Sequence, residues 1–413
     1  MRRLSMLSAV SALAFAAGVS GLANAQDDAE PAMCERSQYA GDAYAPAPAL
    51  AGQTDAPMAA PSAVAVDVVA SGLDHPWALA FLPDGSMLVT ERAGAMRIVG
   101  ADGAVSDPIA NVPAIERAFL TGLTDVVLDP DFAANRTLYF NYITRAPGAE
   151  PPAEGESAAG VPAIGRTVRA RLSDAGDALE DLAVIHEGDG ASRRLVFAPD
   201  GTLFISSGTA IVSGPEPRAL SSAAGKVLRI NTDGSIPADN PFAGEEGALP
   251  ALYSVGHRDL EGATLGPDGQ LWTIEHGPRG GDELNRIVPG ADYGHGTISY
   301  GREYDERLIN DGATQADGLE QPVYFWTPSI GPSGLTFYDG ALFPDWEGDV
   351  FAGAMPMKHL VRLDMEDGRV VGEEQLLADL CARIRDVREG PDGALWVLTD
   401  EDDGQLLRLT PAG

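Results

Sequence analysis

Cysteine is scarce in this sequence: only Cys34 and Cys381 occur among its 413 residues. Two cysteines cannot build a disulfide scaffold, so the fold must depend on an apolar core. In an oxidising compartment the two thiols can pair and clamp the N-terminal segment to the last part of the chain. The sequence leaves open whether they pair or remain separate.

Basic residues are few as well. The chain has 28 lysines and arginines against 61 aspartates and glutamates, a net charge of -33. Such a chain is a poor partner for nucleic acid and for anionic membranes. The acidity itself indicates solubility or a salty habitat and identifies no function.

Long apolar runs are absent after the first 25 residues, so no membrane span is predicted. The start of the chain has Arg2 and Arg3 before an alanine-rich apolar stretch that ends in Ala-Asn-Ala. This pattern predicts a signal peptide over residues 1–25, cleaved before Gln26, and a periplasmic or secreted product. A retained N-terminal anchor is the alternative. Residues 26–62 are rich in alanine and proline and predict a flexible arm.

Residues 63–413 repeat one pattern, a Pro-Asp turn followed by a short run of β-forming residues. Asp-Gly turns join antiparallel strands, and runs of Leu, Val, Ile, Phe and Trp predict strands buried on both faces. The spacing suits four-stranded antiparallel blades, so we expect an all-β, six-bladed β-propeller. A β-sandwich is the alternative, but it would not need the same turn six times. The copies begin at Phe81, Phe197, Leu265 and Gly390 and, in looser form, at Leu128 and Leu342.

The segment from Glu275 to Asn285, EHGPRGGDELN, carries the strongest chemical signal. It follows the predicted strand 271–274 and turns sharply through its glycines and proline. Backbone carbonyls turned outward beside clustered acids suit a hard cation such as calcium. A plain surface turn would require neither Glu275 nor the Asp282-Glu283 pair.

With this segment in view, the chain resembles the soluble sugar dehydrogenases that depend on pyrroloquinoline quinone (PQQ), the glucose/sorbosone dehydrogenase family, and within it the aldose sugar dehydrogenase branch. The resemblance covers about Leu73 to Leu409. The motifs that carry it are EHGPRGGDELN, GKVLRINTDGSIPADNPF from Gly225, YSVGHRD from Tyr253, FWTPSIGPSG from Phe325 and RIRDVREGPDG from Arg383.

The resemblance implies two calcium sites. The carbonyls of Gly277 and Pro278 would bind an active-site calcium that also holds PQQ, with His276 beside the cofactor. Glu283 and Tyr293 match positions that help to hold a second, structural calcium.

The resemblance also implies residues that face the cofactor and the substrate. Arg258, Arg383 and Arg385 match such arginines, and three cations suit a tricarboxylate quinone. Arg383 and Arg385 are two apart on a predicted strand and so share a face; alternatively, these arginines only pair with acids of the propeller. Lys358 lies near the position of a quinone-contacting lysine that Pro356 replaces. Trp326 matches an aromatic wall of the sugar site, with core packing as the alternative.

The chain departs from the family at the catalytic base. Relatives carry a histidine where this sequence has Gly190, and glycine transfers no proton. Asp189 is then the candidate base if burial raises its pKa, and Arg385 the second candidate catalytic residue. His186 lies in an apolar run that predicts an ordinary strand histidine. Further departures at the expected pocket are Leu120, Thr209, Asp259, His295 and Pro356.

Three functions remain open on these observations. The first is a PQQ- and calcium-dependent oxidoreductase that oxidises an aldose sugar or similar alcohol by hydride transfer to the quinone and passes electrons to a soluble periplasmic acceptor. The second is a catalytically degenerate, calcium-stabilised binding or scaffold propeller. The third is a calcium-dependent hydrolase of the lactonase type, whose set of Asn, Asp and Glu ligands is only weakly visible.

Overall fold

The computed structural model of the protein describes Cys34, Asp42 and residues 44–116, 122–153, 161–209 and 217–413. The predicted signal peptide and Leu120 lie outside these residues. In the described part of the chain, no helix is long and apolar enough to cross a membrane.

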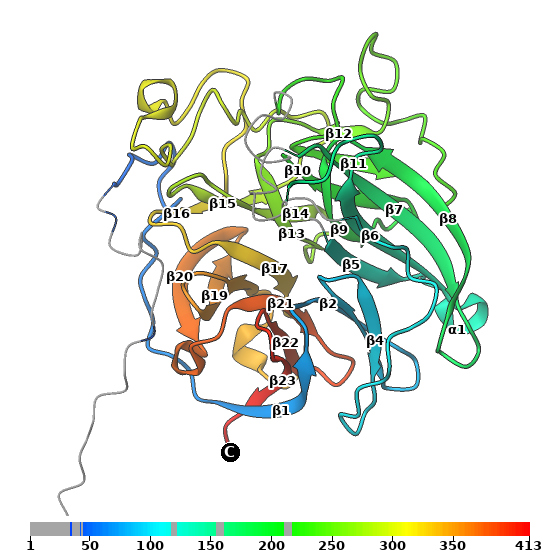
Figure 1. Ribbon diagram of the computed structural model, residues 1–413. Helices are drawn as coiled ribbons and strands as arrows, with labels where there is room; N and C mark the ends of the chain where they lie inside the picture. The colour runs from blue at the N-terminus through cyan, green and yellow to red at the C-terminus, as the bar shows by residue number, and fades with distance from the viewer. Residues whose placement is uncertain (1–33, 35–41, 43, 117–121, 154–160, 210–216) are drawn as a thin grey trace, which may run out of the picture. The chain divides into compact units, whose positions relative to one another are not determined.

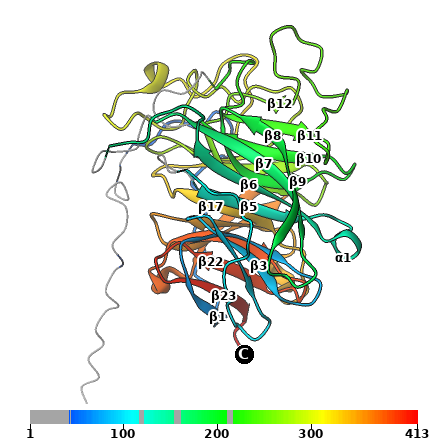
Figure 2. The ribbon, with the colours of Figure 1, turned by 45° about the vertical axis from the view of Figure 1, so that its right-hand side comes forward.

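Six antiparallel sheets make up the described chain, and each is formed almost entirely from consecutive strands (Figure 1). The first sheet contains β2 (Pro76–Phe81), β3 (Met87–Glu91) and β4 (Ala95–Val99). The second contains β5 (Gly122–Leu128), β6 (Thr137–Arg145), β7 (Ala163–Leu172) and β8 (Leu179–Gly188), with the short helix α1 (Phe132–Asn135) between β5 and β6 (Figure 2). The third contains β9 (Ala191–Phe197), β10 (Leu203–Gly208), β11 (Lys226–Ile230) and β12 (Leu252–Ser254).

The remaining sheets follow the same order. The fourth contains β13 (Asp259–Leu265), β14 (Leu271–His276), β15 (Asp282–Arg286) and β16 (Tyr324–Trp326). The fifth contains β17 (Pro332–Phe337), β18 (Val350–Ala354), β19 (His359–Glu366) and β20 (Arg369–Leu376). The sixth contains β21 (Ile384–Glu389), β22 (Leu395–Thr399), β23 (Gly404–Pro411) and β1 (Val64–Leu73). Short 3-10 helices span Ile309–Gly312, Pro344–Trp346 and Ala378–Leu380.

The sheets close into a ring. Their first strands, β2, β5, β9, β13, β17 and β21, contact one another in turn, and β21 contacts β2. The sixth sheet takes β1, the N-terminal strand of the ring, as its outer strand through pairing with β23. The predicted six-bladed β-propeller is therefore confirmed. The first blade differs from the prediction because it has three strands, not four, among the described residues.

The repeated Pro-Asp-Gly turns form as their sequence predicts. In the first blade, Asp84 accepts hydrogen bonds from the backbone amide and the hydroxyl of Ser86, while Gly85 has a positive φ of 85°. Asp200 makes the same two bonds with Thr202 in the third blade. Each such turn brings the second strand of a blade back beside the first, because the aspartate side chain satisfies the turn's amide locally.

A buried charge cluster lies where the inner strands meet. Arg194 on β9 is 1% exposed, and its Nη1 lies 2.9 Å from Asp386 Oδ1 and 3.5 Å from Asp125 Oδ1. Its guanidinium carbon lies 4.1 Å from the centre of the Trp77 ring. Arg388 contacts the same two acids at 2.8 and 3.0 Å. These side chains come from β2, β5, β9 and β21, so the cluster joins four blades.

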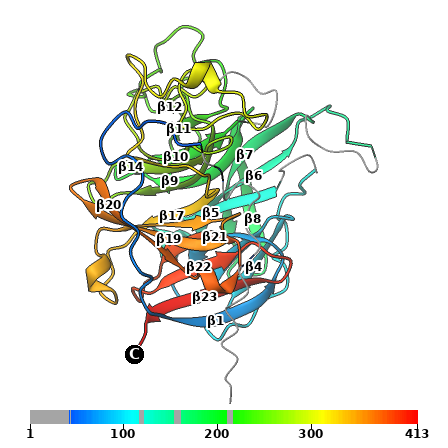
Figure 3. The ribbon, with the colours of Figure 1, turned by 90° about the vertical axis from the view of Figure 1, so that its left-hand side faces the viewer.

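The described part of the arm is hydrogen-bonded to the propeller. Gln53, 2% exposed, donates to the carbonyl of Pro322 and accepts from the amide of Phe325 on β16. Met58 forms a parallel bridge to Glu373 on β20. Figure 3 shows this blue segment running beside β20 towards β1. The composition of the arm could not show these contacts, because their partners lie more than 250 residues away in the sequence.

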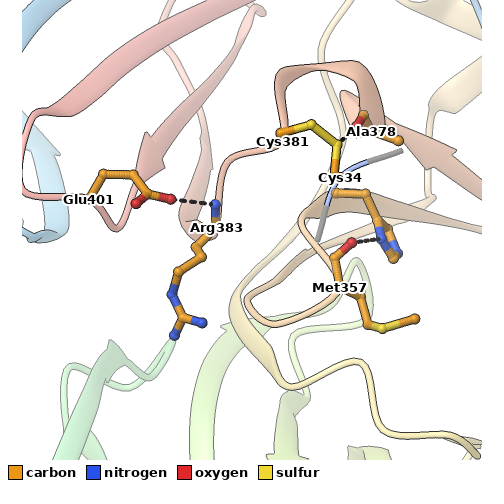
Figure 4. The surroundings of a disulfide bond; sticks show 7 residues. Cys34, Met357, Ala378, Cys381, Arg383 and Glu401 are labelled. Atoms are coloured by element: carbon orange, nitrogen blue, oxygen red, sulfur yellow. Dashed lines mark hydrogen bonds between the residues drawn. A yellow bond between two sulfur atoms is a disulfide. The ribbon is translucent and has the colours of Figure 1, made fainter. Parts of the chain in front are cut away.

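Cys34 and Cys381 form a disulfide, which settles the pairing that the sequence left open. Cys381 stands two residues before Arg383, and the backbone amide of Arg383 donates to Oε1 of Glu401 (Figure 4). The disulfide thus attaches Cys34 to the segment that leads into β21.

Candidate functional site

The predicted site residues come mainly from one end of the blades. Every blade is built in the same strand order, so the loops before the first strands and the loops between second and third strands share one end. Asp189 precedes β9, Arg258 precedes β13 and Arg383 precedes β21. The 277–281 loop joins β14 to β15, also at this end.

A small cavity at the 277–281 loop collects most of the residues predicted for cofactor and calcium. Six predicted positions line it: Arg258, His276, Gly277, Pro278, Glu283 and Tyr293. The other lining residues are Glu275, Gly281, His295, Ile298 and Ser299.

Asp282 organises the loop around this cavity. Its carboxylate is fully buried and accepts hydrogen bonds from the backbone amides of Gly277, Ile330 and Gly331 at 2.7 to 2.8 Å. It also accepts from the hydroxyl of Ser329 at 3.0 Å. Four donors satisfy this carboxylate, so its role is to hold the loop against the start of the fifth blade.

The glycines of the loop are required by close backbone contacts. A Cβ added to Gly277 would lie 2.1 Å from the carbonyl oxygen of Gly280 and 2.4 Å from that of Gly281. Gly280 and Gly281 themselves have φ values of 79° and 72°, a region that side chains rarely adopt. The tight turn leaves backbone carbonyls as the natural ligands of this segment.

Two buried carboxylates face each other beside the loop. Glu275 on β14 and Glu283 on β15 are cross-strand partners. Burial raises the pKa of Glu275 to about 8, and burial together with Glu275 raises the pKa of Glu283 well above its ordinary value. Two acids that share a buried site without a compensating cation resist ionisation. A divalent cation between them would remove that penalty.

The surroundings of this acid pair add oxygen donors. Asn285 is fully buried; its amide nitrogen lies 3.2 Å from Glu283 Oε2, while its Oδ1 has no hydrogen-bond partner. The Tyr293 hydroxyl donates to the carbonyl of Arg286 at 2.6 Å and accepts from the amide of Val288. The Tyr293 hydroxyl is thus engaged by two backbone groups. Acids, an amide oxygen and carbonyls are the donor set that calcium prefers.

Glu275 and Asn285 were missing from the predicted ligand set, although both belong to the EHGPRGGDELN segment. Alternation along β15 places Glu283 and Asn285 on one face, which was a readable signal. The pairing of Glu275 with Glu283 required the hairpin register.

Arg258 and His276 lie directly on the loop. Arg258 Nη1 donates to the carbonyls of His276 and Gly277 at 3.1 and 3.0 Å. His276 Nε2 lies 2.6 Å from the carbonyl oxygen of Pro332. Because a carbonyl only accepts, Nε2 carries the hydrogen, and in the neutral ring Nδ1 is an acceptor. The amide of Thr209 donates to the carbonyl of Arg258 at 2.7 Å.

Arg383 and Arg385 meet at another acid, Asp400. Arg385 Nη2 lies 2.6 Å from Asp400 Oδ2, whereas Arg383 Nε lies 3.9 Å from it. Burial opposes ionisation of Asp400, yet Arg385 and the other cations hold its pKa down to about 2. Arg383 remains 39% exposed at its side chain, so one of the two arginines is available to a ligand.

Arg193 is a site residue that sequence reasoning missed. It is buried, and its Nη2 lies 3.3 Å from Asp259 Oδ1 and 3.4 Å from Glu261 Oε1. Asp259, Glu261 and His276 bring ligand atoms within 4.8 Å of one another. The Arg193 guanidinium already compensates the two acids. Nothing in β9 itself marks this pairing, because Asp259 and Glu261 lie on β13 of the next blade.

The predicted base Asp189 is exposed, so the burial on which its candidacy as a base depended is absent, whereas Gly190 after it is tightly enclosed. Asp189 accepts from the hydroxyl of Ser222 at 2.8 Å and from the amide of Ala223 at 2.7 Å. A Cβ at Gly190 would lie 2.0 Å from Ser207 Oγ and 2.6 Å from the Ala223 carbonyl oxygen, so a larger side chain requires a backbone shift. His186 lies in β8, as an ordinary strand histidine would.

Five predicted site residues do not line the cavity: Asp189, Arg383, Arg385, Trp326 and Lys358. Trp326 is 5% exposed in β16, packs in an apolar cluster and lies with Nε1 3.2 Å from Glu373 Oε2. Its position matches the core alternative. Lys358 sits in the turn between β18 and β19, near Pro356, which packs against Gly331. His295 does line the cavity, and burial lowers its pKa to about 3.

Comparison with known proteins bears on the family of the chain. The family model for glucose/sorbosone dehydrogenase matches residues 73–408. An aldose sugar dehydrogenase of Escherichia coli is 38% identical over 358 residues, covering 86% of this chain and 94% of the relative. The quinoprotein glucose dehydrogenase B of Acinetobacter calcoaceticus is 30% identical, covering 82% and 87%.

The solved structures agree as well. The apo form of the soluble aldose sugar dehydrogenase of Escherichia coli superposes with a TM-score of 0.79 at 36% identity, over 85% of this chain and all of that one. The family match at residues 73–408 covers all the blades except most of β1 and the end of β23. The chain belongs to the glucose/sorbosone dehydrogenase family of PQQ sugar dehydrogenases.

Proposed function

We propose that the protein is a calcium- and PQQ-dependent oxidoreductase that acts on an aldose sugar or a similar alcohol. The observation that carries this proposal is the cavity at the 277–281 loop. It combines backbone carbonyls, two buried acids and an arginine in a chain of the sugar dehydrogenase family. The pair Glu275 and Glu283 supports a cation there, because burial raises the pKa of both acids even though the Arg258 charge acts on Glu275.

The residues of the site would divide between two calcium ions and the cofactor. Gly277 and Pro278 would supply carbonyls to an active-site calcium, while Glu283, Glu275 and the carbonyl of Tyr293 would hold a second one. Further ligands of the cofactor would be Arg258, His276, Arg383, Arg385 and Lys358. When bound, PQQ held by calcium supplies the two-electron oxidant for the sugar.

The side chains of this protein would bind and orient the cofactor and would remove a proton from the substrate. Arg383 and Arg385, fixed by Asp400, would orient anionic groups of the cofactor. Asp189 is the proposed base for the hydroxyl proton of the substrate. Asp189 lies at the same end of the blades as Arg258 and Arg383, which directly precede β13 and β21. Hydrogen bonds from Ser222 and Ala223 fix the direction of its carboxylate.

Replacing Asp189 with asparagine tests the base directly. Turnover should fall by about 100- to 10,000-fold, the usual loss for one general base, while quinone binding stays intact. The matched control is Glu187→Gln. It removes an acid of the outer strand β8 that pairs with Arg166 on β7. Unchanged turnover in Asp189→Asn would remove Asp189 from the mechanism.

A degenerate propeller is the second candidate. It is favoured by Gly190, where Ser207 and Ala223 occupy the space that a base would need, and by Arg193 beside Asp259. Titration of the mature protein with PQQ, with and without calcium, decides between the two by tryptophan fluorescence. Saturable, calcium-dependent quenching supports the dehydrogenase, whereas calcium stabilisation without quinone binding supports the degenerate propeller.

The predicted signal peptide is the basis of a further part of the proposal. We propose that residues 1–25 direct export, that the mature protein acts in the periplasm or outside the cell, and that a soluble acceptor takes its electrons. Fractionation of cells that express the full-length chain, followed by mass determination of the N-terminus, tests the cleavage before Gln26.

A further inference from the structure

Two arginines, Arg279 within the 277–281 loop and Arg302 outside it, are joined by a pair of backbone hydrogen bonds. The amide of Arg279 donates to the carbonyl of Arg302 at 3.1 Å, and the amide of Arg302 donates back to the carbonyl of Arg279 at 3.1 Å. Arg279 lies between Pro278 and Gly280, directly after the carbonyls proposed as calcium ligands. The position of the Arg279 backbone therefore determines where those carbonyls point.

One carboxylate from the N-terminal arm joins both arginines. Asp42 Oδ2 lies 2.6 Å from Arg279 Nε, and Asp42 Oδ1 lies 2.6 Å from Arg302 Nη2. The Asp42 side chain is only 4% exposed, and the amide of Tyr44 also donates to Oδ1. The Arg302 guanidinium lies 5.3 Å from the centre of the Tyr44 ring. Short, enclosed ion pairs of this kind give direction as well as attraction.

The arm is held to the propeller on both sides of Asp42. Upstream, Cys34 is bonded to Cys381. Downstream, the amide of Ala49 donates to the Tyr300 hydroxyl, and the Gln53 side chain is buried. Such attachments keep Asp42 at a high local concentration beside its arginines. Asp42 is thus a fixed part of the loop's surroundings and not a chance surface contact.

We propose that Asp42 is a positioning residue of the calcium site: through Arg279 and Arg302 it sets the orientation of the Gly277 and Pro278 carbonyls. This inference rests on the proposed function, because it concerns the same loop. Asp42 contacts no proposed ligand atom. It acts on the ion through the backbone of Arg279, as outer-shell partners act in other metal sites.

Calcium titration of the mature protein, without quinone, tests the inference by isothermal calorimetry. Asp42→Asn should bind calcium about 10- to 100-fold more weakly, the usual effect of losing an outer-shell partner. Asp55→Asn removes the same charge from an exposed position of the arm and should leave the affinity unchanged. This control separates loop positioning from the general loss of one negative charge.

A thermal measurement distinguishes positioning from simple destabilisation. A purely structural role would lower the unfolding temperature equally in calcium and in chelator. A positioning role shrinks the increase that calcium produces. Arg302→Gln breaks the other half of the contact and should show the same loss, which keeps the test decisive if Asp42→Asn does not fold.

The outcomes separate the inference from the proposed function. Wild-type calcium affinity in either Asp42→Asn or Arg302→Gln would overturn the positioning role while leaving the proposed function in place. No calcium binding by the wild-type protein would overturn the calcium part of the proposed function and the inference with it.

Discussion

The buried acid pair predicts an unusual pH dependence for the calcium-free protein. Burial raises the pKa of Glu275 from 4.5 to about 8 in the folded state. Between these values the folded protein retains a proton that the unfolded chain has lost. Unfolding therefore releases a proton, and the free energy of unfolding falls as the pH rises from about 5 to about 8. Glu283 acts in the same direction.

The size of the effect follows from the two pKa values. The difference between 4.5 and about 8 corresponds to at most about 5 kcal/mol for Glu275 alone. Calcium requires ionised carboxylates, so it should restore stability most strongly at high pH and displace protons near pH 7. At 100 times its dissociation constant, calcium should add about 3 kcal/mol.

Urea unfolding in chelator and in calcium, from pH 5 to pH 8.5, measures this dependence. A net charge of -33 also weakens the fold as carboxylates ionise, so the variant Glu275→Gln is needed to isolate the pair. It should flatten the curve in chelator. Glu366→Gln, an exposed acid at the end of β19, should not. A calcium-free wild-type curve that matches Glu275→Gln at every pH would refute the reasoning.

Three further predictions concern the rest of the fold. Arg194→Met should lower the free energy of urea unfolding by about 3 to 5 kcal/mol, since it removes one of the two arginines that compensate the buried Asp125 and Asp386. Cys34→Ser should lower the free energy of unfolding by about 2 to 4 kcal/mol, and reductant should then have no further effect. Gly190→His should lower the unfolding temperature and should not raise turnover above that of the wild type, because its Cβ meets Ser207 and Ala223. Turnover above wild type would contradict this.

Local chemistry explains which features were predictable. The Pro-Asp-Gly turns close through the aspartate's own neighbours, as Asp84 and Ser86 show. Four such turns and two looser Pro-Asp copies were enough to predict six blades. The glycines of the 277–281 loop likewise indicated a backbone conformation that residues with side chains rarely adopt. These signals act over a few residues, and the loop proposed to bind calcium was recognised for that reason.

Contacts between distant segments were beyond such signals. Arg193 reaches Asp259 and Glu261 across a blade boundary, and nothing in its own strand marks that partnership. Trp326 shows the converse, since a tryptophan fits a sugar wall or a core equally well by sequence. In the structure, β16 places Trp326 among apolar side chains.

The sequence by itself determined the propeller, its family motifs and the loop suited to calcium, because turns, strand periodicity and glycine conformations are local properties of the chain. Only the tertiary structure decided that Glu275 faces Glu283, that Cys34 pairs with Cys381 and that Asp42 braces Arg279. Each of these contacts joins residues on different strands or segments. Their charges and orientations become definite only when the closed ring of blades brings them together.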